Sequence, residues 1–256
     1  MATSEVKFRA GTDPEVFMHN GQQFVSVIGK VPGTKWKPLQ VQGLPEGFTL
    51  QQDNVSLEFG IPPAASKEEF RNYINEVKYA GLKFLKGLSY HTASCVVFPA
   101  DQMQDAEAHI FGCEPDYNAW TRHKNRKPAP PHPFMRSAGG HVHVETKLPP
   151  TSVVKAMDLF LGVPSLFYDK DGAERRQLYG KAGAYRRKSY GVEYRTLSNF
   201  WIFDDNLIDW VWNQTSVALN YVRTNGDLRD TRIRTCIDES NLTLAQEVMQ
   251  HYGVTL

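Results

Sequence analysis

The chain has little cysteine, no long apolar run and almost no net charge. Only three cysteines occur in its 256 residues, and Cys95, Cys113 and Cys236 show no short spacing. We therefore expect neither a disulfide framework nor a cysteine-based zinc site. The 29 Lys and Arg residues balance 28 Asp and Glu residues, which gives a net charge of +1. This balance argues against a protein that coats nucleic acid by bulk electrostatic attraction.

Several other signatures are also missing. No segment approaches the roughly 18 consecutive apolar residues needed to cross a bilayer. Residues 1–9 carry charge early and lack an apolar segment, so no secretory signal peptide is predicted. We therefore expect a cytoplasmic protein with no membrane partner. The pattern Gly-x-x-x-x-Gly-Lys-Ser/Thr is absent too, which argues against a P-loop enzyme.

The patterns that are present predict one α+β domain over residues 1–256, built on an antiparallel sheet. Asn20-Gly21 predicts a hairpin, Ser66 and Glu69 predict a helix start, and Gly81 in that helix predicts a close packing contact. We expect strands at residues 6–18, 24–31, 55–59, 94–98, 141–145 and 190–196. We expect helices at residues 66–86, 151–161 (capped by Thr151 or Ser152), 204–222 and 242–251.

A long irregular segment at about residues 101–137 interrupts this pattern. It contains a basic run at residues 122–127, followed by four prolines before residue 134. A loop of this length in a compact domain is usually functional or mobile. A solvated surface loop and a substrate-contacting loop fit the sequence equally well.

Carboxylates are concentrated at strand-like spacing. Asp13 and Glu15 are two residues apart, so on an extended strand both face the same side, where like charges repel unless a cation lies between them. Thr-Asp-Pro-Glu is also ordinary turn chemistry. Asp53 and Glu58 bracket another short strand, where a solvent-facing carboxylate is the commoner situation.

Histidines show the same spacing after two glycines. His141 and His143 alternate with valines, so both imidazoles face one side of a strand. Gly139-Gly140 before them would let a ligand approach the backbone closely. This pattern favours a functional role for the pair over a structural one.

The last cluster combines an acid with many cations. Glu193 and Arg195 share one face of a strand, where they serve a site or simply form a salt bridge. The preceding segment is rich in cations and glycines, which suits an oligophosphate but also a solvated basic loop. Its cations are Arg175, Arg176, Lys181, Arg186, Arg187 and Lys188.

Taken together, the candidate ligands are carboxylates with one or two histidines and no cysteine. Hard oxygen ligands favour Mg²⁺ or Mn²⁺ over zinc. Such a metal beside arginines and a lysine is typical of nucleotide phosphoryl transfer, in which charge neutralisation carries most of the catalysis.

The segments that contain these acids, histidines and cations, taken in their order along the chain, resemble the carboxylate–amine ligase superfamily of glutamine synthetase and glutamate–cysteine ligase. The resemblance is strongest to the compact amidoligases often encoded by bacteriophages. The resemblance lies in residues 11–17, 53–59, 138–144, 178–186 and 190–199. It implies the fold of the glutamine synthetase catalytic domain, a curved antiparallel sheet with helices on its convex face. The concave face would hold ATP, Mg²⁺ or Mn²⁺ and the substrates.

The resemblance also implies roles for individual residues. The expected metal ligands are Asp13, Glu15, Glu58, His141 and Glu193. The expected catalytic residues are Arg195, Glu193 and His143. The expected contacts to the ATP phosphates are Lys181, Arg186, Arg176 and His143. The chain departs from the family pattern at Asp13, where the large synthetases have Glu, and only Glu58 of the 53–59 segment aligns well, which leaves the number of metals open.

The implied reaction joins a carboxylate to an amine through an acyl phosphate, with release of ADP. The substrates stay open between small molecules, peptides and modified nucleic acid. One alternative is a metal-dependent hydrolase, although only one histidine, His251, follows His143. The other is a nucleic-acid- or peptide-binding module on the same fold, in which Tyr117 and Trp120 beside the basic run stack on bases.

Overall fold

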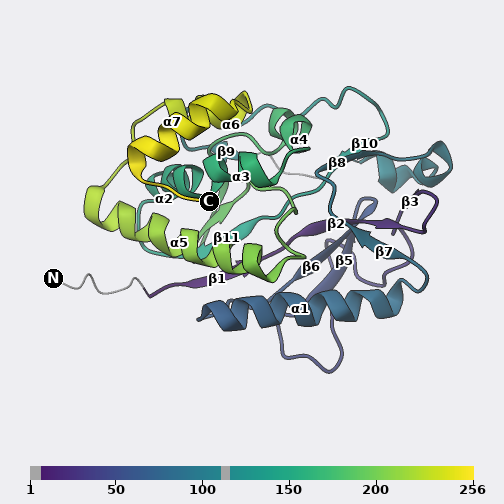
Figure 1. The fold of residues 1–256 in the computed structure, drawn as a ribbon. Helices are drawn as coiled ribbons and strands as arrows, with labels where there is room; N and C mark the ends of the chain where they lie inside the picture. The colour runs from purple at the N-terminus through teal and green to yellow at the C-terminus, as the bar shows by residue number, and fades with distance from the viewer. Residues whose placement is uncertain (1–6, 111–115) are drawn as a thin grey trace.

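Two large antiparallel sheets and a two-stranded one form the β-structure in the computed structural model, which describes residues 7–110 and 116–256 (Figure 1). The first sheet has the order β1-β11-β13-β12-β9, the second has the order β3-β2-β6-β5-β4 with β7 paired to β2, and β8 pairs with β10. The strands are β1 (Arg9–Thr12), β2 (Glu15–His19), β3 (Phe24–Val25), β4 (Leu39–Gln40), β5 (Thr49–Asp53), β6 (Ser56–Gly60), β7 (Ser89–His91), β8 (Cys95–Val97), β9 (Tyr117–Asn118), β10 (Met135–Ser137), β11 (Val142–Glu145), β12 (Ala184–Lys188) and β13 (Gly191–Tyr194).

The two sheets meet at Asp13-Pro14, between β1 and β2. Proline has no backbone N–H, so the strand ladder is interrupted there. Backbone hydrogen bonds nevertheless continue across the break, because Phe59 N donates to Pro14 O (3.3 Å) and Ile61 N donates to Thr12 O (3.3 Å). The result is one curled antiparallel surface, and the single strand predicted over residues 6–18 is wrong.

The helices cover one face of this surface (Figure 1). Helix α1 packs against β5 and β6, α2 packs against β12 and β13, and α5 packs against both helices. The helical segments are α1 (Lys67–Phe84), α2 (Pro150–Met157), α3 (Val163–Tyr168), α4 (Ala173–Leu178), α5 (Asp205–Asn225), α6 (Arg232–Asp238), α7 (Leu242–Tyr252), the 3₁₀ turns η1 (Ala100–Met103) and η2 (Ala106–His109), and the π-helical turn η3 (Asp158–Gly162).

Successive side chains along β11 and β13 point alternately to the helix-covered face and to the open face of the sheet. Val142 and Val144 of β11 and Val192 and Tyr194 of β13 are fully buried. The Tyr194 hydroxyl donates to Asp158 (2.8 Å) in the π-helical turn, so these side chains point toward the helices. Their neighbours in the sequence, among them the predicted site residues, therefore point to the face that the helices leave open.

Several local predictions are confirmed. Asn20 N donates to Gln23 O (3.1 Å) in the predicted hairpin turn. Ser66 Oγ accepts from Glu69 N (3.1 Å) at the start of α1, while the Glu69 carboxylate accepts from Ala65 N (2.8 Å). A Cβ on Gly81 would overlap the Tyr90 hydroxyl, which is the close contact that the sequence indicated.

Other local predictions are corrected. The return strand expected at residues 24–31 is only the two-residue β3, and residues 49–53, 184–188, 173–178 and 232–238 form elements that were not predicted. The helix expected at residues 151–161 begins at Pro150, with Pro149 as its cap, and continues through the π-helical turn into α3. The 101–137 segment contains η1, η2, β9 and β10, so it is not wholly irregular. Val6 and Cys113 lie outside the described residues.

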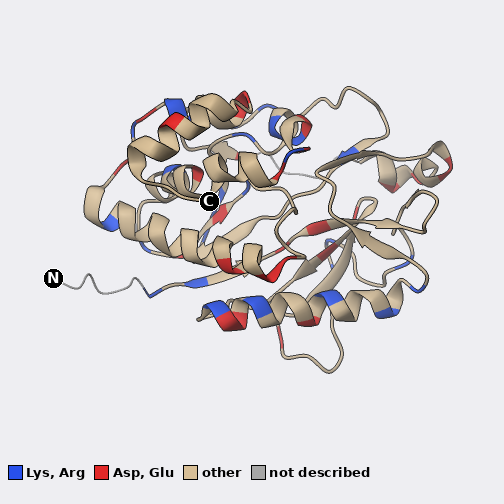
Figure 2. Ribbon diagram, viewed as in Figure 1, with Lys and Arg blue, Asp and Glu red and all other residues tan. Residues whose placement is uncertain are grey.

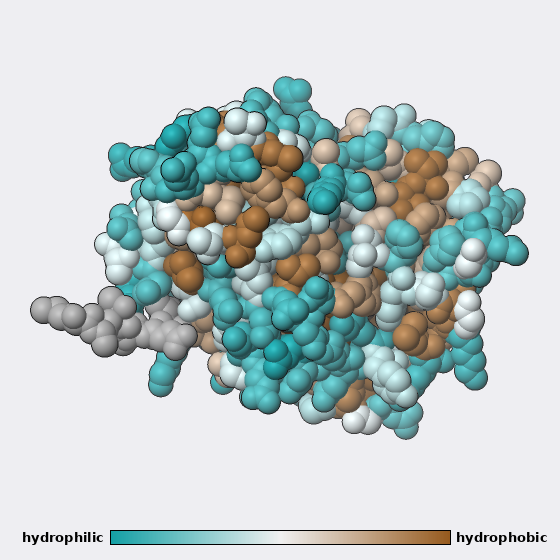
Figure 3. All heavy atoms as spheres, in the orientation of Figure 1, coloured by the Kyte–Doolittle hydropathy of each residue, from teal (hydrophilic) through white to brown (hydrophobic). Residues whose placement is uncertain are grey.

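Charge and hydropathy are mixed over the surface. Basic and acidic residues alternate along the outer side of α1 (Figure 2), and hydrophobic residues are interspersed with hydrophilic ones on the face shown in Figure 3. Among the described residues, we find no helix with the length and apolar character that crossing a membrane requires.

Candidate active site

Two groups of potential metal ligands lie on the open face of the curled sheet. The first consists of Asp13, His141 and Glu193, and the second of Glu15, Asp53 and Glu58. In each group one ligand atom from every residue lies within 4.8 Å of the others. The five residues expected to bind metal are thus divided between two groups, and Asp53 joins the second group as a member that the sequence left undecided.

Strand register positions these groups. Glu15 of β2 is directly opposite Glu58 of β6, and Asp53 ends the neighbouring strand β5. In the other sheet, Glu193 of β13 lies between His143 of β11 and Arg186 of β12. Side chains directly opposite each other in antiparallel strands have closely spaced Cβ atoms, so the register pairs Glu15 with Glu58 and Glu193 with His143. Asp13, His141 and Asp53 lie at or just beyond strand ends, from which they join these pairs.

Like charges repel one another in the acidic group, although Lys35 pairs with Asp53 (3.3 Å). Burial, followed by the charge of Asp53, raises the pKa of Glu15 to about 7, although Gly139 N donates to the Glu15 carboxylate (2.8 Å). Burial and the nearby charges of Asp13, Asp53 and Glu15 raise the pKa of Glu58 well above its usual range. A divalent cation would remove this repulsion, so the group fits Mg²⁺ or Mn²⁺, which prefer oxygen ligands.

The first group holds an ionised acid beside a neutral imidazole. His143 Nε2 lies 2.9 Å and His141 Nδ1 lies 3.3 Å from Asp13 Oδ1. Burial opposes ionisation of Asp13, but the two histidines hold its pKa well below the usual range. Burial and then Arg195 lower the pKa of His141 to about 4, so its ring is neutral near pH 7. A neutral imidazole with an ionised carboxylate is a suitable ligand pair for a divalent metal.

Glu193 is surrounded by cations. It forms ion pairs with Arg195, with Lys188 (2.8 Å) and with Arg186 (3.4 Å). Burial would raise its pKa, but Arg195 and the two histidines lower it to about 2. The salt bridge between Glu193 and Arg195 that the sequence allowed is therefore present, and it lies within the cluster of predicted site residues.

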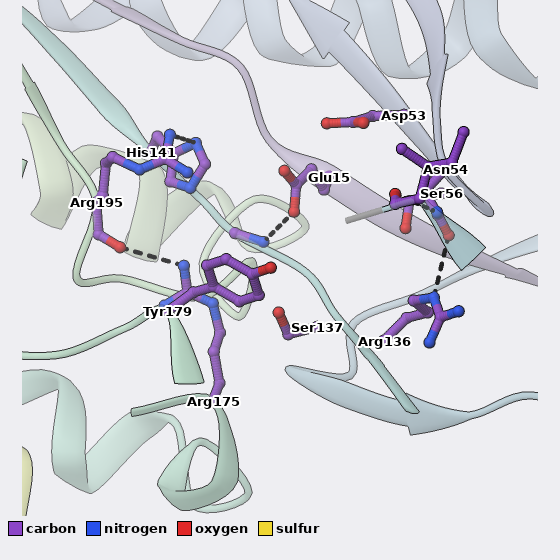
Figure 4. A pocket seen from close by; sticks show the side chains of 12 residues that line it. Glu15, Asp53, Asn54, Ser56, Arg136, Ser137, His141, Arg175, Tyr179 and Arg195 are labelled. Carbon is purple, nitrogen blue, oxygen red and sulfur yellow. Dashed lines mark hydrogen bonds between the residues drawn. The ribbon is translucent and has the colours of Figure 1, made fainter. Parts of the chain in front are cut away.

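A cavity extends from the acidic group across the junction of the sheets (Figure 4). Its lining combines the carboxylates of Glu15 and Asp53 with three arginines. Arg136 lies beside Asn54, on the side of Asp53, whereas Arg175 and Arg195 lie on the opposite side (Figure 4). The lining residues are Glu15, Asp53, Asn54, Ser56, Ile110, Arg136, Ser137, Gly139, His141, Arg175, Tyr179 and Arg195. We call it the arginine cavity.

A second cavity lies on the other side of Asp13 and His143. Glycines and small side chains line much of it, and Tyr190, whose hydroxyl contacts His143 Nδ1, lines another part. The lining residues are Arg9, Gly11, Thr12, Asp13, Gly47, Thr49, Gly60, Ile61, Pro63, His143, Glu145 and Tyr190. Glu15 and Asp53 of the acidic group therefore line the arginine cavity, while the first group contributes His141 to that cavity and Asp13 to the second.

Of the four expected phosphate contacts, Arg176, Lys181 and Arg186 line neither cavity, and of these three only Arg186 pairs with Glu193. Arg176 points away from both cavities, because its guanidinium pairs with Asp169 (3.4 Å) and Nε donates to Ser240 (2.9 Å). Lys181 lines neither cavity, and its carbonyl accepts from Thr196 Oγ1 (3.0 Å). Since residues 175 and 176 are adjacent in helix α4, their side chains diverge, and it is Arg175 that lines the arginine cavity.

The glycines before His141 lie in close contact with other groups of the protein. A Cβ on Gly139 would overlap the His141 ring, and a Cβ on Gly140 would overlap Ser198 O. The sequence indicated that these glycines let a ligand approach the backbone. In the structure they make room for groups of the protein itself, and Gly139 also lines the arginine cavity, so the predicted ligand approach stays a prediction.

Asp116 is a site residue that the sequence did not single out. Its carboxylate lies 3.5 Å from Arg195 Nε, and it accepts from Asn125 Nδ2 (2.8 Å). Asp116 therefore connects the basic 122–127 segment to Arg195. No local pattern indicated this contact, because it joins residues 79 positions apart, and only the pairing of β9 with β12 brings the two segments together.

Comparison with known proteins bears on the activity of this site. A search of curated proteins gives no match. Residues 128–226, less than half of the chain, match the sequence profile of a family described as "Phage phiEco32-like COOH.NH2 ligase-type 2". That segment contains His141, Glu193 and Arg195, whereas the acidic group lies entirely outside it. The match supports an enzyme that joins a carboxylate to an amine, a carboxylate–amine ligase.

Proposed function

We propose that the protein is a carboxylate–amine ligase that depends on ATP and on Mg²⁺ or Mn²⁺ and forms an amide through an acyl phosphate. The observation that carries this proposal is the placement of two ligand groups beside the ion-paired Arg195 and Glu193. The match to a ligase family supports it independently. A metal-dependent hydrolase accounts less well for the cations gathered around Glu193.

The ligand groups are suited to hold divalent metal that neutralises the negative charge of a triphosphate. Glu193 would hold its metal while keeping Arg195 and Lys188 at fixed positions. Arg195 lines the arginine cavity, so its guanidinium can stabilise charge on the phosphoryl group as it is transferred. His143 contacts Asp13 and lines the second cavity, where a nucleotide phosphate would be within its reach.

The proposed ligase reaction has two steps. A carboxylate oxygen of the substrate attacks the γ-phosphorus of ATP, and the bond to the β–γ bridging oxygen breaks, releasing ADP and leaving an acyl phosphate. The amine nitrogen then attacks the acyl carbon, phosphate leaves with the electron pair of the C–O bond, and the amine loses a proton. The arginines contribute through charge stabilisation and positioning, and they form no covalent bond.

Trapping the activated carboxylate tests the proposal. Hydroxylamine reacts with acyl phosphates to give hydroxamates, so incubation with Mg²⁺, ATP, a panel of mono- and dicarboxylates and hydroxylamine should give hydroxamate and ADP in equal amounts. Glu193→Gln should lower this yield at least tenfold, whereas Glu68→Gln, on the exposed start of α1, should not change it. Failure of saturating Mg²⁺ and a non-hydrolysable ATP analogue to bind would contradict the proposal.

The metal requirement can be tested without activity. Glu58→Gln should make the protein more stable than the wild type in EDTA, because it relieves repulsion among like charges. It should also abolish most of the increase in melting temperature that Mn²⁺ gives the wild type, with Glu68→Gln again as the control. Equal stabilisation of Glu58→Gln and wild type by Mn²⁺ would show that the acidic group binds no metal.

A further inference from the structure

Lys35 brings an ammonium group to the acidic group, although it lines neither cavity. Its Nζ lies 3.3 Å from Asp53 Oδ2, and the two side chains are 36% and 18% exposed. Asp53 belongs to the acidic group together with Glu15 and Glu58, and one oxygen of each carboxylate lies within 4.8 Å of the others. The ammonium therefore lies on a carboxylate that a divalent cation would also bind.

A tight turn positions Lys35 beside the end of β5. Thr34 and Lys37 each donate a backbone N–H to the carbonyl oxygen of the other (3.0 Å), so Lys35 lies at the tip of a two-residue hairpin. Gln52 N donates to Gly33 O (2.9 Å), which holds the base of this hairpin against the last residues of β5. The backbone thus places Lys35 within reach of the acidic group.

The ion pair between Lys35 and Asp53 is of a kind that a divalent cation can break. Ion pairs that stay partly exposed are weak, because water solvates both partners and the long lysine side chain loses rotamer freedom. A divalent cation carries twice the charge of an ammonium and binds several carboxylates at once. The hairpin tip can also shift with little loss of packing, since Trp36 is 92% exposed and Lys37 is exposed too.

We propose that Lys35 is a tethered counter-ion of the acidic group, which competes with divalent metal for Asp53 and so lowers the affinity of this group for metal. The inference rests on the metal requirement in the proposed function. Without metal, the ammonium offsets part of the repulsion among the carboxylates. When metal binds, Lys35 separates from Asp53, and its return makes the metal easier to release.

Chemical labelling of the wild type tests this competition without a variant. Acetic anhydride at a limiting dose acetylates accessible lysine amines, and mass spectrometry of peptides gives the rate at each lysine. Saturating Mg²⁺ should raise the rate at Lys35 at least twofold above the rate in EDTA, because the ammonium leaves Asp53. Lys37, in the same hairpin, should react equally fast in both. An unchanged or lower rate at Lys35 would overturn the inference.

Calorimetric titration with Mn²⁺ is the second test. Lys35→Met should bind Mn²⁺ at least threefold more tightly than the wild type, whereas Lys35→Arg keeps the charge and should stay within twofold of the wild type. The advantage of Lys35→Met should shrink as the salt concentration rises, because salt screens partly exposed charges. Lys37→Met is the matched control, since it removes a charge from the same hairpin, and it should leave the affinity unchanged.

The Glu58→Gln background shows whether the effect belongs to the acidic group. Because Glu58→Gln impairs that group, adding Lys35→Met should raise the affinity for Mn²⁺ less than it does in the wild type. A gain of equal size in both backgrounds would overturn the inference, by placing the effect at another site. An affinity of Lys35→Met equal to that of the wild type, or below it, would also overturn the inference, the lower value by making Lys35 a residue that orients Asp53 for the metal.

The proposed function and this inference fail in different ways. If the wild type binds no Mn²⁺, the metal requirement of the proposed function fails, and the inference fails with it. If the wild type binds Mn²⁺ and forms hydroxamate, but Lys35→Met binds Mn²⁺ no more tightly, the ligase proposal stands and the role of Lys35 is refuted.

Discussion

Glu15 and Glu193 carry the same side chain, yet the structure shifts their pKa values in opposite directions. Both are removed from water, which by itself would raise both values. Glu15 faces Asp53, and its pKa rises to about 7, whereas Glu193 faces Arg195 and two histidines, and its pKa falls to about 2. The charge of each carboxylate at neutral pH is thus decided by its neighbours. The acidic group has an ion pair between Asp53 and Lys35 (3.3 Å), whereas Glu193 of the first group pairs with three cations.

Asp158 gives a residue-scale prediction outside the site. It accepts from Trp120 Nε1 (2.6 Å) and the Tyr194 hydroxyl (2.8 Å), but burial raises its pKa from 3.8 to about 7. A carboxyl whose pKa is higher in the folded than in the unfolded protein contributes its full stabilisation at pH values below its unfolded-state pKa. This contribution is lost as the pH rises through its folded-state pKa. The free energy of unfolding should therefore fall between about pH 4 and pH 7, by up to roughly 1.4 kcal/mol per pH unit from this group.

Asp158→Asn should make that decline less steep. The measurement is urea denaturation of both proteins in EDTA at several pH values. The other buried carboxyls contribute equally to both proteins, so they cancel in the comparison. Parallel pH profiles would show that Asp158 is ionised throughout the range.

At the scale of elements, the break at Asp13-Pro14 has the largest consequence for the site. The alternation of side chains along an extended strand predicted that Asp13 and Glu15 share a face, and both do lie on the open face of the sheets. The interruption nevertheless assigns Asp13 to the histidine group and Glu15 to the acidic group. Thr12 Oγ1 donates to His141 O (2.6 Å) and Glu15 N donates to Gly139 O (2.8 Å), which holds both sides of the break against the strand that carries the histidines.

Helix α1 gives an element-scale prediction that runs against helix propensity. Alanine is more favourable than glycine in a helix by about 1 kcal/mol. A Cβ on Gly81 would overlap the Tyr90 hydroxyl and lie 3.2 Å from Leu57 Cδ2, so Gly81→Ala should destabilise the protein by about 1–3 kcal/mol.

A double-mutant cycle with Tyr90→Phe checks this explanation. Removing the hydroxyl relieves the overlap, so Gly81→Ala should cost less in the Tyr90→Phe background than in the wild type. Thermal or urea denaturation of the four proteins measures the difference. An equal cost in both backgrounds would place the clash elsewhere.

At the scale of the molecule, the larger of two hydrophobic clusters among the described residues joins both sheets to the helices. The same cluster contains Ala10 of β1, Leu57 of β6, Ile74 of α1, Val192 of β13 and Val248 of α7. Because residues from the beginning, middle and end of the chain bury one another, no part of this core is complete alone. The single domain predicted over residues 1–256 stays a prediction, which the unfolding behaviour tests.

We expect the protein to unfold in one cooperative transition. Calorimetry should give equal calorimetric and van't Hoff enthalpies, and near-ultraviolet and far-ultraviolet circular dichroism should change together. Saturating metal and nucleotide should shift the whole transition, by about 2.7 kcal/mol at a ligand concentration one hundred times the Kd. Two separated transitions would instead show that the sheets belong to different domains.

The sequence by itself determined the local features whose causes are local. Alternation placed His141 and His143 on one face, capping residues placed the start of α1, and Asn20-Gly21 placed the first hairpin. Residue chemistry also indicated a metal site built from oxygen and imidazole ligands. A resemblance in short motifs indicated a ligase, which the matched family supports.

The tertiary structure decided how these pieces meet. Strand register joins Glu15, Asp53 and Glu58 into one group, and helix α4 turns Arg175 into the cavity while Arg176 pairs with Asp169. The contact of Asp116 with Arg195 depends on strands that are distant in the sequence. Such contacts depend on long-range pairing and burial, which act between segments and leave no periodic signal within any one of them.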